Sequence, residues 1–214
     1  MRPCRTALPR WPWLSLAALA GLTIHASGCG GDDAAATDAD ADAGTGPGAD
    51  AAGPGDDPRL YPLEVGRRWS YAVTSTYPSC PADPAREVHV TGTVVIDGRT
   101  TYESTGLCGQ VGHTSVDGDV VEDYYDWGPT GWSRLLDEPV ADGHSWTTGN
   151  GSATYGMRYE QAGAVDGYPD CWRVVQEVAY TSRWTYCRGV GLVRFELVDL
   201  AGGTINASLI DRSW

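Results

Sequence analysis

The stretch "EVHVTGTVVIDGRTTYESTGLC", residues 87–108, decides the fold class of this chain. β-Branched apolar residues alternate with polar ones along its first half, and an Asp97-Gly98 pair interrupts the pattern. A period of two is typical of a strand that buries one face, and Asp-Gly between two such strands favours a type I′ hairpin turn. We therefore expect an antiparallel hairpin with one apolar face, formed by Val88, Val90, Val94 and Ile96.

Similar alternating segments recur roughly every ten residues along the rest of the chain, separated by Gly or Asp-Gly. Asp117-Gly118 predicts a second hairpin turn, and signals for helices are nearly absent. One apolar face is also clear in the last segment, at Ile205, Ala207 and Leu209. These features predict a mainly β fold with little helix, a single antiparallel sheet of about ten strands that is curved or forms an open half-barrel.

The segments "YPLEVGRRW" (residues 61–69) and "EPVADGHSW" (residues 138–146) share one frame: proline, an aliphatic residue, a glycine three positions later and a tryptophan three positions after that. Glycine allows a positive φ or a bulge, and tryptophan supplies a large apolar area for a core. The residues between these fixed positions differ, whereas a shared binding site would need shared polar residues. We interpret the frame as a device that starts a strand, and as a trace of duplication.

The first residues form an export signal. Three arginines precede the short apolar run "WPWLSLAALAGLTI", and "ASGC" then places small residues before Cys29. This order resembles a bacterial lipoprotein signal, and the resemblance implies that residues 1–28 are removed and that Cys29 carries lipid. Gly30 in place of Asp implies, by the sorting logic of such lipoproteins, an anchor in the outer membrane. The alternative is an ordinary signal peptide with an unrelated cysteine.

Residues 29–58 are expected to form the lipid anchor and a disordered tether. After Cys29 this stretch contains only Gly, Ala, Asp, Thr and Pro, so no large apolar side chain offsets the entropy cost of ordering it. One domain, residues 59–214, remains. The net charge of the whole chain is −13, which argues against a nucleic-acid partner. The expected membrane contact is the lipid anchor itself.

The domain contains four cysteines, and an even number in an exported chain indicates two disulfides. Three connectivities are open. We favour Cys80–Cys108 with Cys171–Cys187, because each bond closes a short loop. No Cys-x-x-Cys pair or neighbouring histidine indicates a metal, so we expect neither a metal nor another cofactor.

Three segments together resemble a family of bacterial secreted and lipid-anchored proteins of unknown function. They are "YPLEVGRRWSY" at the start of the domain, "VDGYPDCWRV" (residues 165–174) and "YCRGVGLVRFE" (residues 186–196). The resemblance implies a mostly antiparallel β domain in the cell envelope, similar to the open half-barrels of lipoprotein-carrier proteins. It also suggests a local disulfide between Cys171 and Cys187. The family offers no catalytic residues to carry over.

The sequence contains no recognisable catalytic motif. His89, His113 and His144 are far apart in the sequence, and His89 is expected on the outer face of its strand. The acidic stretch 117–126 lacks calcium-loop spacing, so we interpret it as a hairpin turn with exposed acids. Five tryptophans are candidates for lining a lipid or glycan site, with core packing as the alternative: Trp127, Trp132, Trp146, Trp172 and Trp184.

These observations predict a non-catalytic, lipid-anchored envelope protein whose β domain binds or scaffolds a lipid, a glycan or an envelope protein through an apolar groove. Two alternatives stay open. A purely structural interaction module would have a filled core and no groove. A hydrolase would need His113 or His144 within hydrogen-bond reach of both a carboxylate and a hydroxyl.

Overall fold

The computed structural model describes residues 57–126, 130–151, 153–177 and 181–214. These residues form twelve strands: β1 (Arg68–Ser75), β2 (Asp83–Ile96), β3 (Arg99–Thr105), β4 (Val111–Asp117), β5 (Val120–Tyr125), β6 (Gly131–Leu136), β7 (Ser145–Gly149), β8 (Thr154–Val165), β9 (Tyr168–Glu177), β10 (Thr181–Cys187), β11 (Gly191–Val198) and β12 (Thr204–Ser213). None of the described segments is a helix with the length and apolar character needed to cross a membrane.

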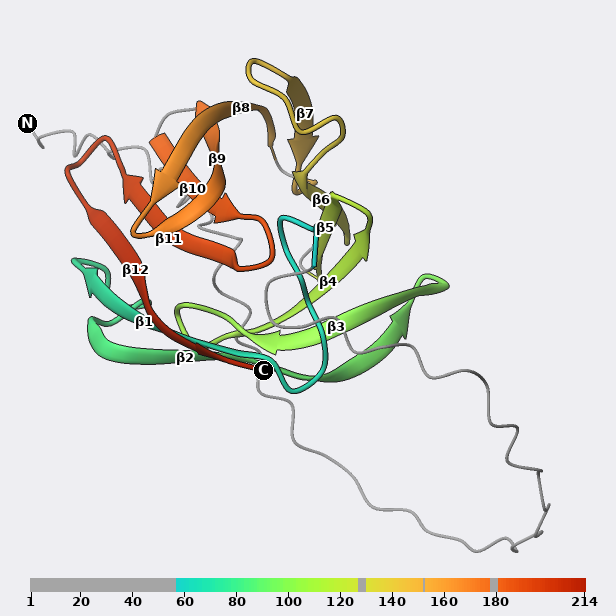
Figure 1. The fold of residues 1–214 in the computed structure, drawn as a ribbon, viewed down its shortest axis with the longest axis horizontal. Coiled ribbons are helices and arrows are strands. Elements are labelled where there is room, and N and C mark those ends of the chain that lie inside the picture. Colours follow the sequence, from blue (N-terminus) through green and yellow to red (C-terminus); the bar gives the residue numbers. More distant parts are fainter. Residues whose placement is uncertain (1–56, 127–129, 152, 178–180) are drawn as a thin grey trace, which may run out of the picture.

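The twelve strands form one antiparallel sheet that curves into a nearly closed barrel. Each strand pairs with its neighbour in the sequence except at β6 and β7, and β1 pairs with β12. Figure 1 shows the resulting ring, which runs from β6 through β1 and β12 to β7. The predicted curved antiparallel sheet is confirmed, with more strands and a more complete closure than expected.

The two ends of the barrel differ in their connections. At one end, here called the turn end, β2–β3, β4–β5 and β8–β9 are joined by two residues each. The predicted Asp97-Gly98 turn has positive φ at both residues, 50° and 76°. The second hairpin turns at residues 118–119, one position later than predicted. The other end, here called the loop end, carries the connections 76–82, 106–110, 126–130, 150–153 and 199–203, whereas the long connection 137–144 between β6 and β7 lies at the turn end.

The two frames shared by residues 61–69 and 138–146 have the same backbone geometry. The N–H of Gly66 donates to Val90 O at 2.9 Å, and that of Gly143 donates to Tyr159 O at 3.0 Å. Both glycines have positive φ, 95° and 77°, at the third position of a four-residue turn. Val90 and Tyr159 each face two consecutive residues of the frame, so each turn leads into a bulge. The structural interpretation of the frame is therefore supported.

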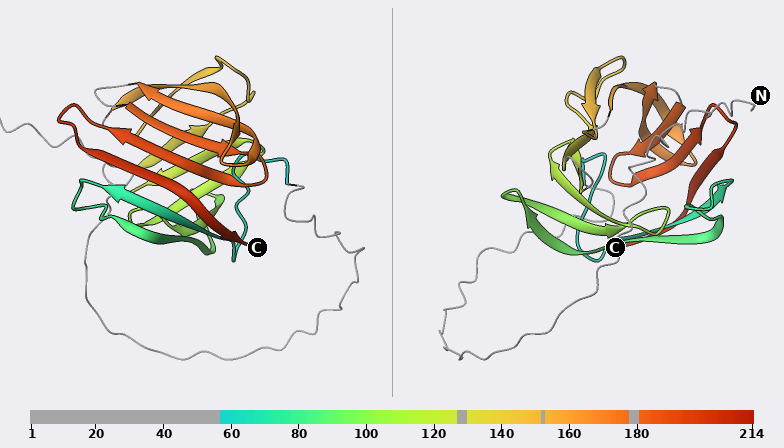
Figure 2. Two further views of the ribbon diagram at one scale, coloured as in Figure 1. Left: turned by 60° about the vertical axis from the view of Figure 1, so that its left-hand side comes forward. Right: turned by 180° about the vertical axis from the view of Figure 1, so that it is seen from behind.

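A segment here called the strap, residues 57–67, closes the turn end. Leu60 and Leu63 are fully buried, and burial of each contributes about 2 kcal/mol. The Leu60 N–H donates to Asp119 Oδ1 at 2.9 Å, and Arg188 Nη1 donates to Pro58 O at 2.6 Å. The strap and the C-terminus lie at the same end of the barrel (Figure 2). The strap is thus held by two separate turns, β4–β5 and β10–β11.

Side chains fill the interior. Trp69 of β1 and Tyr159 of β8 are the largest fully buried residues, and most of the buried apolar residues form one continuous cluster. In β12 the predicted apolar face is confirmed, because Ile205, Ala207 and Leu209 are all buried. The described part of the barrel therefore resembles a packed core more than a ligand-carrying lumen.

One predicted face was wrong. Val88 and Val90 are buried as expected, but the exposed fraction of Val94 is 39%. The pairing of β2 with β3 shifts between Val90 and Gly92, which is a bulge. A one-residue shift moves every later side chain to the opposite face of the strand. The residues that continue the predicted apolar pattern beyond Gly92 therefore lie on the opposite face from Val88 and Val90.

Both disulfides have the favoured connectivity. Cys80–Cys108 joins the β1–β2 loop to the β3–β4 loop, and Cys171–Cys187 joins two residues that face each other on β9 and β10. The first bond ties two neighbouring loops together at the loop end. The second holds two strands beside the turn that contacts the strap.

Candidate functional site

The ring is built from two six-stranded halves, β1–β6 and β7–β12, each starting with one copy of the shared frame. The first strand of each half meets the last strand of the other, so the β1–β12 and β6–β7 junctions correspond. Eight residue pairs join β1 to β12. No backbone ladder joins β6 to β7 among the described residues. This β6–β7 junction, here called the seam, therefore differs from the corresponding β1–β12 junction.

Side chains hold the seam in place of a ladder. The Arg134 N–H of β6 donates to the Thr148 hydroxyl of β7 at 2.6 Å. The Trp146 indole Nε1–H of β7 donates to Arg134 O at 3.2 Å. Ser133 Oγ lies 3.4 Å from Thr148 Oγ1. A hydroxyl and an indole thus replace the backbone partners that Arg134 would have in a regular sheet.

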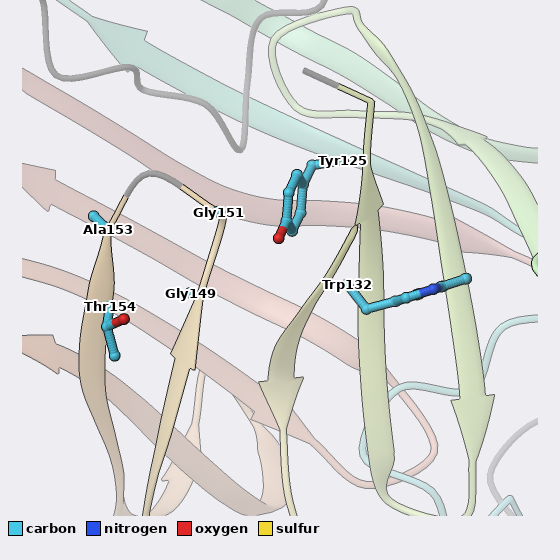
Figure 3. Close-up of a pocket in the computed structure, with 6 residues that line it drawn as sticks. All are labelled: Tyr125, Trp132, Gly149, Gly151, Ala153 and Thr154. Carbon is cyan, nitrogen blue, oxygen red and sulfur yellow. The ribbon is translucent and has the colours of Figure 1, made fainter. Parts of the chain in front are cut away.

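An open groove of about 410 Å³ lies at the loop end of the seam, between the start of β6 and the end of β7 (Figure 3). Its lining is mainly backbone, hydroxyl and small side chains: Tyr125, Trp132, Gly149, Gly151, Ala153 and Thr154. The Tyr125 ring points into the space between the strands, whereas the Trp132 ring is turned away from it. The groove is therefore not the apolar groove that the sequence predicted.

Alternation along the strands shows which backbone groups face the seam. The backbone N–H and C=O of Arg134 both form hydrogen bonds across the seam. Because backbone groups alternate in direction along a strand, the N–H and C=O of Trp132, two residues earlier, also point toward the seam. On β7, the Asn150 N–H bonds to Ala153, on the far side of the β7–β8 turn. The backbone N–H and C=O groups of Thr147 and Gly149 therefore point away from β8 and toward the seam.

The five candidate tryptophans do not gather at one site. The Trp132 ring lies on the outer wall, 5.3 Å from the Tyr124 ring, with the Arg99 guanidinium 4.7 Å above it. The other described candidates, Trp146, Trp172 and Trp184, pack in or against the core. Trp127 lies outside the described residues. Of the four described candidates, only Trp132 contributes to the groove, and in Figure 3 its indole ring points away from the space.

His144 meets half of the requirement set for a hydrolase. Its Nε2 lies 3.0 Å from Asp137 Oδ2, and the other oxygen of Asp137 accepts from Arg134 Nη1 at 2.8 Å. The imidazole stacks on Trp146 and Tyr159. Within the described residues no hydroxyl is hydrogen-bonded to this imidazole, because the Tyr159 hydroxyl bonds to the backbone of Asp137. The pair therefore stabilises the β6–β7 connection and lacks a nucleophile beside it.

The remaining histidines lie apart from this pair. His113 Nε2 is 3.5 Å from Glu103 Oε2 on the outer wall. The His89 backbone N–H donates to Thr105 Oγ1 at 2.9 Å. The described residues contain no group of three or more side chains suited to hold a metal ion.

Two acids expected to be exposed have internal roles. Asp119 bonds the strap at Leu60 and forms an ion pair with Arg188 at 2.8 Å. Asp123 shares the inner face of β5 with the buried Val121. Burial raises the pKa of Asp123 to about 6, against the opposing effects of a hydrogen bond from Thr114 and of nearby His113. The interpretation of residues 117–126 as a turn with exposed acids was wrong at these two positions.

No protein-family model matches this sequence, and no curated protein matches it. Among solved structures, the chain is similar to a crystal structure from Parabacteroides distasonis ATCC 8503 that is described as a "putative lipoprotein". The identity is 12%, the TM-score is 0.41, and the match covers 74% of this chain and 100% of the other. A likeness this weak does not establish a shared function. The family resemblance inferred from the sequence motifs therefore stays a prediction.

Proposed function

We propose that this chain is a non-catalytic binding or scaffolding protein of the cell envelope, anchored by lipid at Cys29, that engages its partner at the seam groove. The observation that carries the proposal is the seam itself. The corresponding β1–β12 junction is fully paired, whereas β6 and β7 are bridged by side chains and leave an open groove at the loop end. Loops and strand ends held by a rigid scaffold are common places for binding.

The groove supports a polar partner better than a lipid. A lipid carrier needs an apolar cavity large enough for acyl chains, and the described interior is occupied by the core. The groove lining includes the exposed hydroxyl group of Thr154 and the backbone of glycines. A glycan or a segment of an envelope protein matches this chemistry.

Site-specific photo-crosslinking in cells tests the proposal. A photoreactive amino acid at Thr154, in the groove, is compared with the same amino acid at Thr74, which is also exposed but lies on the outer wall of β1. We expect a discrete adduct from position 154 that position 74 does not give. Equal or absent adducts would favour the alternative of a purely structural module.

A further inference from the structure

We infer that the seam groove binds an extended polypeptide segment of another envelope protein, which pairs with the exposed backbone edge of β6 or β7 as an added strand. This inference rests on the proposed function and names its partner class. The groove is bordered by two strand edges whose backbone N–H and C=O groups face each other without a ladder, at Trp132 on one side and at Gly149 on the other. Such edges are templates for pairing with a further strand.

The equivalence of the two halves supports a strand as the occupant. At the corresponding junction, eight residue pairs join β1 to β12, with one register shift between Ser70 and Tyr71. At the seam, the Thr148 hydroxyl and the Trp146 indole satisfy Arg134, which lies nearer the turn end of β6. Toward the loop end, the bridges between described residues do not extend to Trp132. The backbone groups that border the groove therefore retain the donor and acceptor pattern of a sheet edge.

The lining of the groove distinguishes a polypeptide from a glycan. Gly149, Gly151 and Ala153 form one wall, so a second backbone can approach closely without meeting large side chains. A sugar ring, in contrast, is usually held against the flat face of an aromatic side chain. The Trp132 ring is turned to the outer wall, where it contacts Tyr124 and Arg99. The lining thus favours backbone pairing over stacking.

Two common protections of an edge strand are absent from the groove end of β6 and β7. Among other devices, natural edge strands are blunted by proline, lysine or a bulge that twists the edge away. Neither β6 (GWSRLL) nor β7 (SWTTG) contains proline or lysine. The one irregularity in the pairing of β6 with β5 lies between Val121 and Glu122, near the turn end. The groove end of the edge is therefore regular and able to accept a strand.

A proline at a single edge position tests the inference. The Trp132 N–H faces the seam and not β5, because Arg134, two residues later on the same strand, uses its own N–H across the seam. Trp132→Pro removes this donor while leaving the β5–β6 ladder intact, and proline is tolerated on edge strands where the N–H is unpaired. Trp132→Val also lacks the indole ring but keeps the donor, and it serves as the matched control. A phage-displayed library of random 12-residue peptides, selected against the purified full chain, supplies the probe.

The best selected peptide should bind Trp132→Val as tightly as the unaltered chain and should bind Trp132→Pro about tenfold more weakly. A form of the peptide that carries N-methyl groups at alternate residues, so that the amides along one of its edges cannot donate, should not bind. If Trp132→Pro proves unstable, the unaltered chain gives the second measurement, because peptide binding should slow hydrogen exchange at the Trp132 and Gly149 amides.

If both variants bind the peptide with equal affinity and hydrogen exchange at the two amides does not change, the inference of an added strand is overturned. Failure to select any peptide, or groove-specific binding of soluble peptidoglycan saccharides instead, would also overturn it. The proposed function would stand in each case where position 154 still gives its specific adduct. If position 154 gives no specific adduct, the proposed function is contradicted as well.

Discussion

Replacing the interior acid Asp123 by asparagine should make the stability of this protein less dependent on pH. Burial raises the Asp123 pKa from 3.8 to about 6, so the folded state favours the protonated carboxyl. This group's contribution to stability is fully present below pH 3.8 and is lost as the pH rises through about 6. The difference corresponds to about 3 kcal/mol, at 1.36 kcal/mol for each pH unit between the two pKa values.

We therefore expect Asp123→Asn to be more stable than the unaltered protein by about 2 to 3 kcal/mol at pH 7.5 and by little at pH 4. The amide oxygen can still accept the hydrogen bond from the Thr114 hydroxyl, now 2.6 Å from Asp123 Oδ1. Guanidinium unfolding of the full chain with its disulfides intact, followed by tryptophan fluorescence from pH 4 to 8, measures the difference.

Thr114→Val provides a second, opposite test. It removes a hydrogen bond that favours the Asp123 carboxylate, so the pKa of Asp123 should rise further and the upper end of the pH range over which stability is lost should move above 6. A stability difference between Asp123→Asn and the unaltered protein that is the same at pH 4.5 and 7.5 would refute the reasoning. It would mean that Asp123 is well hydrated in the folded protein.

Thr148→Val should lower the free energy of unfolding by about 1 to 3 kcal/mol, because it leaves the Arg134 N–H without its acceptor. Denaturant unfolding measures the loss, and unchanged hydrogen exchange at the Arg134 amide would contradict it. Trp146→Phe keeps an aromatic ring but removes the donor to Arg134 O, for an expected loss of about 1 kcal/mol in the same assay. Exchanging both Cys171 and Cys187 for serine should cost about 3 kcal/mol by the loop-entropy model, given a separation of 16 residues; an unchanged unfolding midpoint would speak against that bond as a restraint.

Local signals in the sequence predicted the strands well. Asp-Gly turns and alternating apolar residues depend on φ preferences and on one buried face, both of which are properties of a few neighbouring residues. A third pair, Asp166-Gly167, also has positive φ at both residues and joins β8 to β9, so the same rule would have found it. Gly92 likewise marks the bulge that reversed the face of Val94.

The interior position of Asp123 could also have been predicted from the sequence. Strict alternation places it on the face of Val121 and Tyr125, both buried. The expectation of exposed acids overrode that pattern, because carboxylates are seldom buried. Alternation was the better guide here.

The seam could not be predicted from the sequence. Whether the first and last strands of a sheet meet depends on the twist and tilt summed over all twelve strands, and no short motif encodes that sum. Arg134 and Thr148 are common strand residues with no distinctive spacing, and the frame that contains Trp146 does not indicate that its indole bridges the seam. Only the tertiary structure shows that Thr148 serves as a backbone substitute.

The strap has a mechanical consequence. Any pulling force transmitted through the residues before position 57 enters the barrel at the turn end, where Asp119 and Arg188 hold the strap from two different turns. The groove lies at the opposite pole of the barrel. The points that hold the strap and the groove therefore lie at opposite ends, so a partner bound in the groove as proposed would not collide with the surface that holds the strap.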